Sequence, residues 1–429
     1  MVSPDPPFDP RWLDELVELV STPRRRPPRL EDVYLERHLE VRLTAADGVW
    51  QMQECRSEGT AVRWSFPARG VLTGRTGVTP AIVSELLTRH GCDARPSSRT
   101  APASELDAPR GWSEWARALA ARFGARRVSV IYAERRAAVV RADGWREAAT
   151  PALVRVEASD EPAAALLATW GHPRLGEWLS RLLEAPPPKP WTPDPGERLP
   201  VLFTDGSGGV LLHELLGHMA EADLVVCGAS PLVGLVGAAL GPATLTVVDD
   251  PTRSDLPGGF SCDDEAVPAA ILPIVTDGRL AGWICDRASG ELLGHPPGRG
   301  RRSSWRRPPA PRLSNLVVAP GEEDPVAMER AVDRGLVVTR LGGATTDTAS
   351  GRVVLRVERG WELRHGRRRR AVSGCELTGG ILATLARLDA TLGNDAEADW
   401  RLGWCVKDGE PLATGSLCPT LLVHEMEVA

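Results

Sequence analysis

The stretch Gly208–Asp223, GGVLLHELLGHMAEAD, places His213, Glu214 and His218 inside an apolar run. Two imidazoles and a carboxylate this close together are the minimum set for a metal ion with a bound water and an adjacent base. The stretch therefore predicts a catalytic metal site on a buried helix, around which the rest of the chain is organised. The alternative is a buried amphipathic helix with two incidental histidines.

The spacing of the two histidines makes a prediction about the backbone. His218 follows His213 at i+5, whereas the common zinc-protease helix H-E-x-x-H has its histidines at i and i+4. In a regular α-helix, i+4 lies about 40° around the axis and i+5 about 140°. Both rings can meet one ion if a single π-type turn widens the helix, and Gly217 is where we expect the backbone to yield. Glu221, at i+3 from His218, is expected to hold a ligand imidazole.

This stretch resembles the signature of the TldD/PmbA family of peptidases, in particular the TldD-type subunit with its H-E-x-x-x-H helix. Further segments resemble those of the family in the same order, so that the resemblance covers residues 200–429. These segments are Thr246–Pro268, Asp277–Gly294, Gly298–Asn315, Thr346–Leu355 and Leu392–Glu410. The last of them is similar to the family segment that holds a cysteine ligand, and Cys405 stands at that cysteine.

The resemblance implies a zinc metallopeptidase in which His213, His218 and Cys405 bind Zn²⁺ and leave a fourth position for water. Glu214 would then be the general base and not a ligand. TldD-type proteins are two-domain subunits that pair around an internal chamber, often with a sister subunit that lacks the zinc motif. The resemblance therefore implies a homodimer, or a heterodimer with a TldE/PmbA-like subunit, that hydrolyses unfolded or short peptides. Several family members mature or degrade small peptide products.

Two other classes of function stay open at this stage. A non-catalytic subunit of the same fold would bind and present peptides, and such a decayed site should have lost at least one of its ligands or its base. A nucleic-acid-associated regulator would use the arginines of Gly298–Arg312, and its binding would depend strongly on salt. The complete set of His213, Glu214, His218 and Cys405 favours the peptidase.

The composition is ordinary for a globular chain with room for two or three domains. Of its 429 residues, 42% are hydrophobic and 25% are charged, and the net charge is -6. That charge gives no global electrostatic support for nucleic-acid binding. The eight cysteines include no C-x-x-C pair, and the sequence has neither a secretory pattern at its start nor a run of 18 apolar residues. We expect a cytoplasmic protein without a membrane span.

Periodicity predicts an α/β domain with an antiparallel sheet in the N-terminal part. Helical spacing of apolar residues is found at 11–22, 79–87, 112–124 and 166–184. Thr79 followed by Pro80 is typical of a helix start. Alternation of apolar and charged residues, typical of antiparallel strands with one wet face, is found in 33–66, with further strand candidates at 127–140 and 153–157.

The segment 185–197, APPPKPWTPDPGE, is the predicted domain boundary because its six prolines fit neither a helix nor a central strand. We expect residues 1–190 to form the α/β domain that makes the dimer contact and the chamber wall. Residues 191–429 are expected to form a mainly β metallopeptidase domain that carries the metal-binding helix. Strand candidates there are 243–248, 269–276, 353–357 and 361–364, with a hairpin turn at 277–278. The whole chain is thus predicted to be α+β.

The remaining polar groups are weaker candidates for function. Gly298–Arg312 is predicted to be a loop near the active site and not a nucleic-acid surface. Three adjacent acidic residues are expected to be hydrogen-bonded or solvated and not a calcium site, namely Asp263, Asp264 and Glu265. Two histidines are spare ligand candidates, His295 and His424. Three more are expected on the surface or satisfied in the core, His38, His90 and His172.

Overall fold

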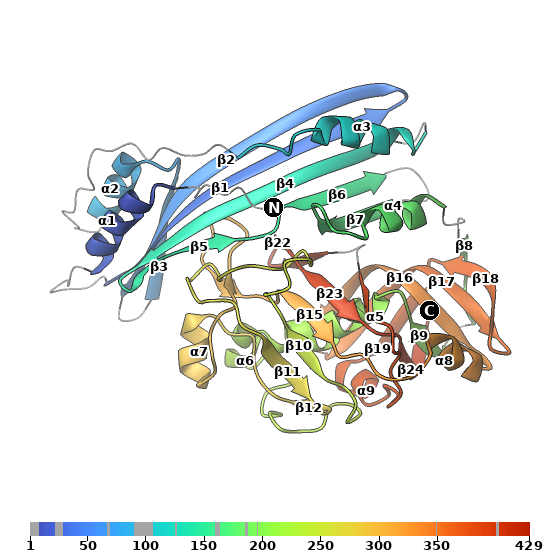
Figure 1. The fold of residues 1–429 in the computed structure, drawn as a ribbon. Coiled ribbons are helices and arrows are strands. Elements are labelled where there is room, and N and C mark those ends of the chain that lie inside the picture. Colours follow the sequence, from blue (N-terminus) through green and yellow to red (C-terminus); the bar gives the residue numbers. More distant parts are fainter. Residues whose placement is uncertain are drawn as a thin grey trace.

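The chain folds as predicted into an α+β protein, with an N-terminal antiparallel sheet and a β-rich C-terminal domain (Figure 1). The structure is a computed structural model. It describes residues 8–21, 29–66, 69–89, 106–124, 127–158, 164–184, 188–194, 196–348, 350–399 and 403–429. None of the described helices has the length and apolar character needed to cross a bilayer.

The N-terminal sheet has the strand order β3-β2-β1-β4-β6-β7, with β5 paired to β4. Its strands are β1 (Arg29–Ala46), β2 (Val49–Phe66), β3 (Arg69–Thr76), β4 (Val128–Arg141), β5 (Gly144–Ala149), β6 (Leu153–Ala158) and β7 (Ala164–Thr169). The accompanying helices are α1 (Pro10–Ser21), α2 (Pro80–Thr88), α3 (Trp112–Ala121) and α4 (Leu175–Glu184). The helices predicted at 11–22, 79–87 and 112–124 and the strands predicted at 33–66, 127–140 and 153–157 are confirmed, apart from small shifts at their ends.

Helices cover one face of this sheet because the apolar residues of β1 alternate along the strand. Leu35 packs in the cluster formed with α1 and α2, and Leu39 packs in the cluster formed with α3 and α4. The predicted start of α2 is confirmed, since the Thr79 hydroxyl accepts a hydrogen bond from the Ile82 N–H at 3.3 Å.

The helix predicted at 166–184 is wrong in its first part. Residues Ala164–Thr169 form β7, which pairs antiparallel with β6, and α4 begins only at Leu175. Gly171 between them has a φ of 81°, a conformation that ends the strand in a turn. Leu166 and Leu167 are both buried. A segment with helix-compatible apolar spacing therefore becomes a strand because a partner strand and a core are available beside it.

The second face of the N-terminal sheet differs from the wet face that the charge alternation predicts. Asp32 and Glu36 of β1 are buried there, with exposed fractions of 0% and 3%. Asp32 forms an ion pair with Arg302 of the C-terminal domain at 3.2 Å. Arg135 of β4 bridges Glu36 at 3.0 Å and Asp264 at 2.8 Å. Asp32, Glu36 and Arg135 on this face are therefore part of the contact between the two domains.

Five strands of the C-terminal domain close into a ring, because β16 pairs with β9 on one side and with β17 on the other. The ring consists of β9 (Glu197–Phe203), β16 (Arg334–Asp347), β17 (Arg352–Arg364), β19 (Glu376–Gly380) and β24 (Leu421–Val428). Two further strands extend the sheet beyond β17, β18 (Arg367–Ser373) and β8 (Lys189–Pro190). The strands predicted at 353–357 and 361–364 are parts of the single strand β17. Of the predicted boundary segment, residues 185–187 and 195 lie outside the described residues.

A second sheet of short strands, ordered β12-β11-β10-β15-β23-β20, packs beside the ring. Its members are β10 (Val247–Asp249), β11 (Leu272–Thr276), β12 (Arg279–Leu280), β15 (Asn315–Val318), β20 (Glu397–Ala398) and β23 (Gly415–Cys418). Two isolated hairpins are β13 (Gly300–Arg301) with β14 (Ala310–Pro311) and β21 (Trp404–Lys407) with β22 (Glu410–Ala413). The predicted turn at 277–278 joins β11 to β12. Of the strand predicted at 243–248, residues 247–248 belong to β10, whereas residues 243–246 precede it without strand structure.

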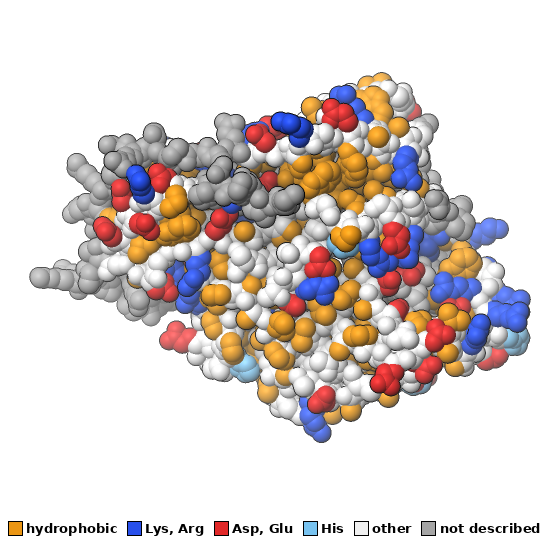
Figure 2. Space-filling view, in the orientation of Figure 1, with side chains coloured by type: hydrophobic (Ala, Val, Ile, Leu, Met, Phe, Trp, Pro, Cys, Tyr) orange, Lys and Arg blue, Asp and Glu red, His pale blue; other side chains and the backbone are white. Residues whose placement is uncertain are grey.

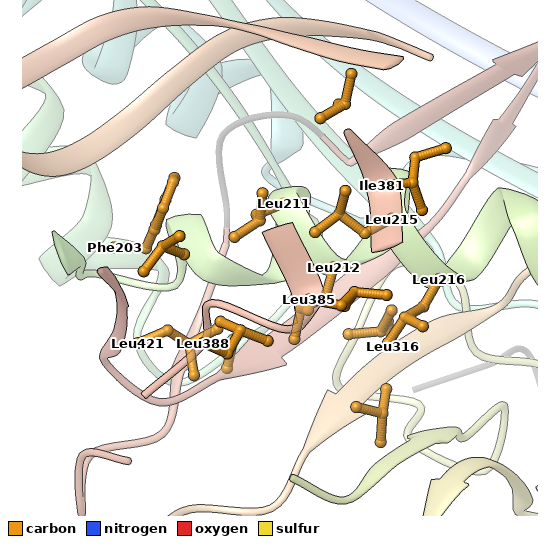
Figure 3. Packing of buried hydrophobic residues seen from close by; sticks show 14 of the residues in the cluster. Phe203, Leu211, Leu212, Leu215, Leu216, Leu316, Ile381, Leu385, Leu388 and Leu421 are labelled. Carbon is orange, nitrogen blue, oxygen red and sulfur yellow. The ribbon is translucent and has the colours of Figure 1, made fainter. Parts of the chain in front are cut away.

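The metal-site helix α5 (Ser207–Leu212) and its continuation run through the core between the ring and the second sheet. Figure 3 shows Leu211, Leu212, Leu215 and Leu216 of this segment among side chains from both sheets. All four leucines have an exposed fraction of 0%. The other short helices of this domain are α6 (Ala222–Val226), α7 (Arg287–Leu293), α8 (Pro325–Ala331) and α9 (Ile381–Leu385). Burial of the leucines on this segment fixes the direction in which its polar residues point.

Candidate metal centre

The predicted π-type turn is confirmed between the two histidines. Residues His213–Gly217 form a π-helical turn, in which the His218 N–H donates to the His213 carbonyl. The turn brings the two rings together, with centroids 4.7 Å apart and planes at 86°. A β-carbon on Gly217 would lie 3.4 Å from Leu313 and 3.7 Å from the His213 ring. The widened turn therefore places the two histidine rings on the same side of the helix, whereas a regular α-helix would separate them by about 140° around its axis.

The start of α5 is set by close contacts with the C-terminal strands. Gly206 precedes the helix with a φ of 81°, and the Ser207 hydroxyl donates to the Val338 carbonyl of β16 at 2.8 Å. A β-carbon on Gly209 would come within 2.3 Å of the Ser416 hydroxyl oxygen. These glycines allow the helix to lie against β16 and β23, which holds the histidines in place.

Cys405 completes a group of three potential ligands. The His213, His218 and Cys405 donor atoms all lie within 4.8 Å of one another, and Cys405 Sγ is 3.4 Å from His218 Nε2. Ordinary tetrahedral zinc distances place a sulfur and a nitrogen ligand about 3.6 Å apart. The donor set and its spacing therefore fit a zinc ion. Burial alone would raise the pKa of the Cys405 thiol, but His213 and His218 outweigh it and lower this pKa to about 5.

Glu214 lies beside this group without belonging to it. Its Oε2 accepts a hydrogen bond of 2.6 Å from the Thr346 hydroxyl of β16. This contact orients a carboxylate that lines the same cavity as the three potential ligands, which is compatible with a base that acts on a metal-bound water.

Glu221 contacts His218 as the i+3 spacing predicts. Its Oε2 lies 3.1 Å from His218 Nδ1 and 2.8 Å from Lys407 Nζ. We assign the His218 proton to Nδ1, because this leaves Nε2 toward Cys405. Burial would raise the pKa of the Glu221 carboxyl, but His218 and then Lys407 outweigh it and lower this pKa to about 2. Glu221 is therefore an anion that orients one of the three potential ligands.

Three residues of the centre were not predicted from the sequence. Thr346 binds Glu214, Lys407 binds Glu221, and Arg312 donates to Cys405 Sγ at 3.3 Å. The sequence could have drawn attention to Lys407, because it is one of two lysines, with Lys189, in a chain whose other Lys/Arg positions are all arginine. Arg312 and Thr346 lay in segments that resemble the family, but nothing in their spacing linked them to the helix.

Replacing Lys407 by methionine is expected to lower the affinity for Zn²⁺ about 10–100-fold, because Glu221 would lose its buried cation and hold His218 less firmly. Competition with a chromogenic zinc chelator measures this affinity. The matched control is Lys189→Met, which removes an exposed lysine of β8. Equal affinities for the two variants would contradict a role for Lys407 in the centre.

A cavity of about 560 Å³ lies over the three potential ligands. It is bounded by the π-turn, by residues 343–346 of β16 and by the hairpin that carries Cys405. Acidic groups outnumber lysine and arginine in its lining, which contains Lys407 and the carboxylates of Glu214, Glu221, Asp223, Asp399 and Asp408. The centre is therefore accessible to a molecule of the size of a short peptide segment.

The other candidates from the sequence lie away from this group. His424 pairs with Asp389 at 2.8 Å, and the His295 ring packs 6.4 Å from that of Trp283. His172 stacks on Trp178, with ring centroids 4.2 Å apart. His38 lies in β1, and His90 falls outside the described residues. None of these described histidines belongs to the three-ligand group.

The acidic and arginine-rich segments also have structural partners. Asp263, Asp264 and Glu265 are buried, as predicted for a hydrogen-bonded feature, and Asp263 accepts the Gly300 N–H at 2.9 Å. Arg302 of the arginine-rich loop is 1% exposed and faces the N-terminal domain. On the surface, Figure 2 shows blue Lys and Arg side chains interleaved with red Asp and Glu. The loop lies near the centre as predicted, because Arg312 reaches Cys405.

The C-terminal part of the chain is similar to known metalloproteases. Residues 196–429 match the family described as the PmbA/TldA metallopeptidase C-terminal domain. The chain is 29% identical over 235 residues to a metalloprotease TldD homolog of Haemophilus influenzae, covering 54% of this chain and 48% of that protein. It is 25% identical over 240 residues to a zinc metalloprotease TldD homolog of Saccharolobus solfataricus, covering 55% of this chain and 52% of that protein. The chain spans about half the length of these curated relatives.

The fold is shared over nearly the whole chain. The structure of TldE from Thermococcus kodakarensis superposes with a TM-score of 0.71 and 14% sequence identity, covering 97% of this chain and 100% of that one. The family match includes the π-turn histidines, Glu214 and Cys405, and it extends over more than half of the sequence. The chain therefore belongs to the TldD/PmbA family of metallopeptidases.

Proposed function

We propose that this chain is a zinc-dependent peptidase that hydrolyses unfolded or short peptides. The observation that carries the proposal is the group of His213, His218 and Cys405, with donor atoms within 4.8 Å of one another, beside Glu214 and open to a cavity. Two imidazoles and a thiolate suit zinc, and three protein ligands leave the open position of a catalytic site.

Each residue of the centre has a distinct task in this proposal. His213, His218 and Cys405 would hold the ion, which would supply Lewis-acid polarisation of the peptide carbonyl and lower the pKa of water. Glu214 removes the proton from the attacking water and delivers it to the leaving amine. Because Thr346 occupies Oε2 of Glu214, we assign the proton transfer to Oε1. Glu221 keeps the His218 ring oriented during the reaction.

The proposed substrate is an extended peptide segment. A cavity of about 560 Å³ has room for a few residues of extended chain and not for a folded domain. We further propose that residues 1–190 and 191–429 act as two domains, with β8 (Lys189–Pro190) at the boundary pairing with β18 of the second domain. We also propose that the subunit pairs in the cytoplasm around a chamber. The partner would be a second copy or a sister subunit, which the likeness of this fold to TldE supports.

The test uses the purified full chain, stripped of metal with a chelator and then reloaded with one equivalent of Zn²⁺. We expect the reloaded protein to cut an unfolded protein such as reduced, alkylated lysozyme into fragments seen by mass spectrometry. The stripped protein should not, and the same protein substrate in a folded form should stay intact. Tight zinc and peptide binding without any cleavage would contradict the proposal and favour a non-catalytic peptide-binding subunit.

A further inference from the structure

Arg312 is a buried arginine that contacts a proposed metal ligand directly. Its side chain is 5% exposed. One terminal nitrogen lies 3.3 Å from Cys405 Sγ and donates to the Cys405 carbonyl at 2.8 Å. The other terminal nitrogen donates to the Glu410 carbonyl at 3.2 Å. Arg312 therefore ties together both strands of the β21–β22 hairpin and the sulfur that the hairpin presents to the centre.

The same guanidinium also lies near Glu221, the residue that orients a second proposed ligand, His218. Its Nε lies 3.8 Å from Glu221 Oε1, and Glu221 holds His218 through its other oxygen. The backbone N–H of the next residue, Leu313, donates to Glu221 Oε1 at 3.3 Å. A planar fork with several fixed donors can make these contacts at once, which the single ammonium of a lysine cannot.

The contact between Arg312 and Cys405 Sγ affects how strongly a thiolate ligand would donate charge to the metal. The negative charge of a cysteine ligand makes the bound ion a weaker Lewis acid than an ion held by neutral histidines alone. A charge-assisted hydrogen bond to the sulfur draws electron density away from the metal–sulfur bond. Arg312 is placed to supply such a bond to Cys405.

We propose that Arg312 is a positioning residue that orients the Cys405 thiolate and reduces its donation of charge to the metal. The inference rests on the proposed zinc site. It goes beyond that site because it proposes that Arg312, which is not a ligand, increases the Lewis acidity of the bound ion. It follows from contacts of the side chain with the ligand sulfur and with Glu221.

The loop offers a matched control in Arg301. This arginine is also buried, at 7% exposed, and it donates to the Leu313 and Ala413 carbonyls at 2.5 and 2.9 Å. Both residues therefore anchor the loop to the same part of the hairpin region, but Arg312 is the one whose donor reaches Cys405 Sγ. Loss of either arginine should disturb packing. Only loss of Arg312 should remove the hydrogen bond to Cys405 Sγ and so change the electron density on this sulfur.

The experiment replaces zinc by Co²⁺ in the full chain and records the thiolate-to-cobalt charge-transfer band. We expect Arg312→Met to shift this band to longer wavelength, because the sulfur electrons are no longer stabilised by the guanidinium. Arg312→Lys should give a smaller shift, and Arg301→Met should leave the band in place. Activity of the zinc forms should fall about 10–100-fold in Arg312→Met, mainly through kcat.

Each result separates this inference from the zinc-site proposal. A wild-type protein without a thiolate-to-cobalt band would contradict the proposed site itself. A wild-type band that keeps its position in both Arg312 variants would overturn the inference and leave the site intact. Equal shifts in the Arg312 and Arg301 variants would also overturn it, because the effect would then come from loop packing. If Arg312→Met does not fold, the smaller shift in Arg312→Lys decides the question.

Discussion

Glu214→Gln is expected to keep its zinc and to lose peptide hydrolysis by about 10²–10⁴-fold, the usual range for removal of a general base. Glutamine has the size of glutamate, and its carbonyl oxygen can still accept the bond of 2.6 Å that Thr346 donates to Oε2. Its amide cannot accept a proton from water at neutral pH. Because Glu214 lies outside the three-ligand group, the substitution should leave the metal in place.

The measurement is the initial rate of cleavage of an unfolded substrate, together with zinc content by elemental analysis of the same preparation. Asp408→Asn is the matched control, since it removes an exposed carboxylate from the lining of the same cavity. We expect the control to retain most of the activity. A Glu214→Gln protein that stays active would assign the base to another group, and one that loses its zinc would make Glu214 a ligand.

Cys405→Ala is expected to lose most of its zinc, whereas the wild type should retain about one ion per chain when purified without added metal. The thiolate is one of three proposed ligands, and alanine supplies no donor. The loss of the ion should abolish hydrolysis as well. Elemental analysis after dialysis against a weak chelator checks the prediction.

Cys375→Ala is the matched control for this experiment. Cys375 is also buried, with an exposed fraction of 1%, but it is not part of the ligand group. Removing it should change stability slightly and zinc content not at all. Full zinc in Cys405→Ala would contradict the proposed ligand set. Hydrolysis by that variant at the wild-type rate would end the assignment of the centre as the active site.

Much of the fold could be predicted from local patterns. The alternation in β1 and β2, the Thr79 start of α2 and the turn at 277–278 depend on residues close together in sequence, and all were confirmed. The helix predicted at 166–184 is wrong in its first part for the opposite reason. Their apolar spacing suits a helix, but β6 offers hydrogen bonds to Ala164–Thr169, and this tertiary partner outweighs the local preference.

The charged face of the N-terminal sheet shows a second limit of local patterns. Alternating charges predict a face in water, and the same alternation occurs when a second domain supplies the opposite charges. Asp32 is buried beside Arg302, which lies 270 residues later in the chain. A single sequence does not reveal this pairing, because the two residues belong to different domains and meet only through tertiary packing.

The sequence by itself determined that His213 and His218 would share one segment, and their i+5 spacing required the π-turn that the structure contains. It also determined the buried leucines that point these rings toward the cavity. Only the tertiary structure decided what surrounds them. Cys405 is 187 residues from His218, and Lys407, Arg312 and Thr346 come from three different segments. Helix geometry is a property of neighbouring residues, whereas contacts across a site depend on how distant strands pack.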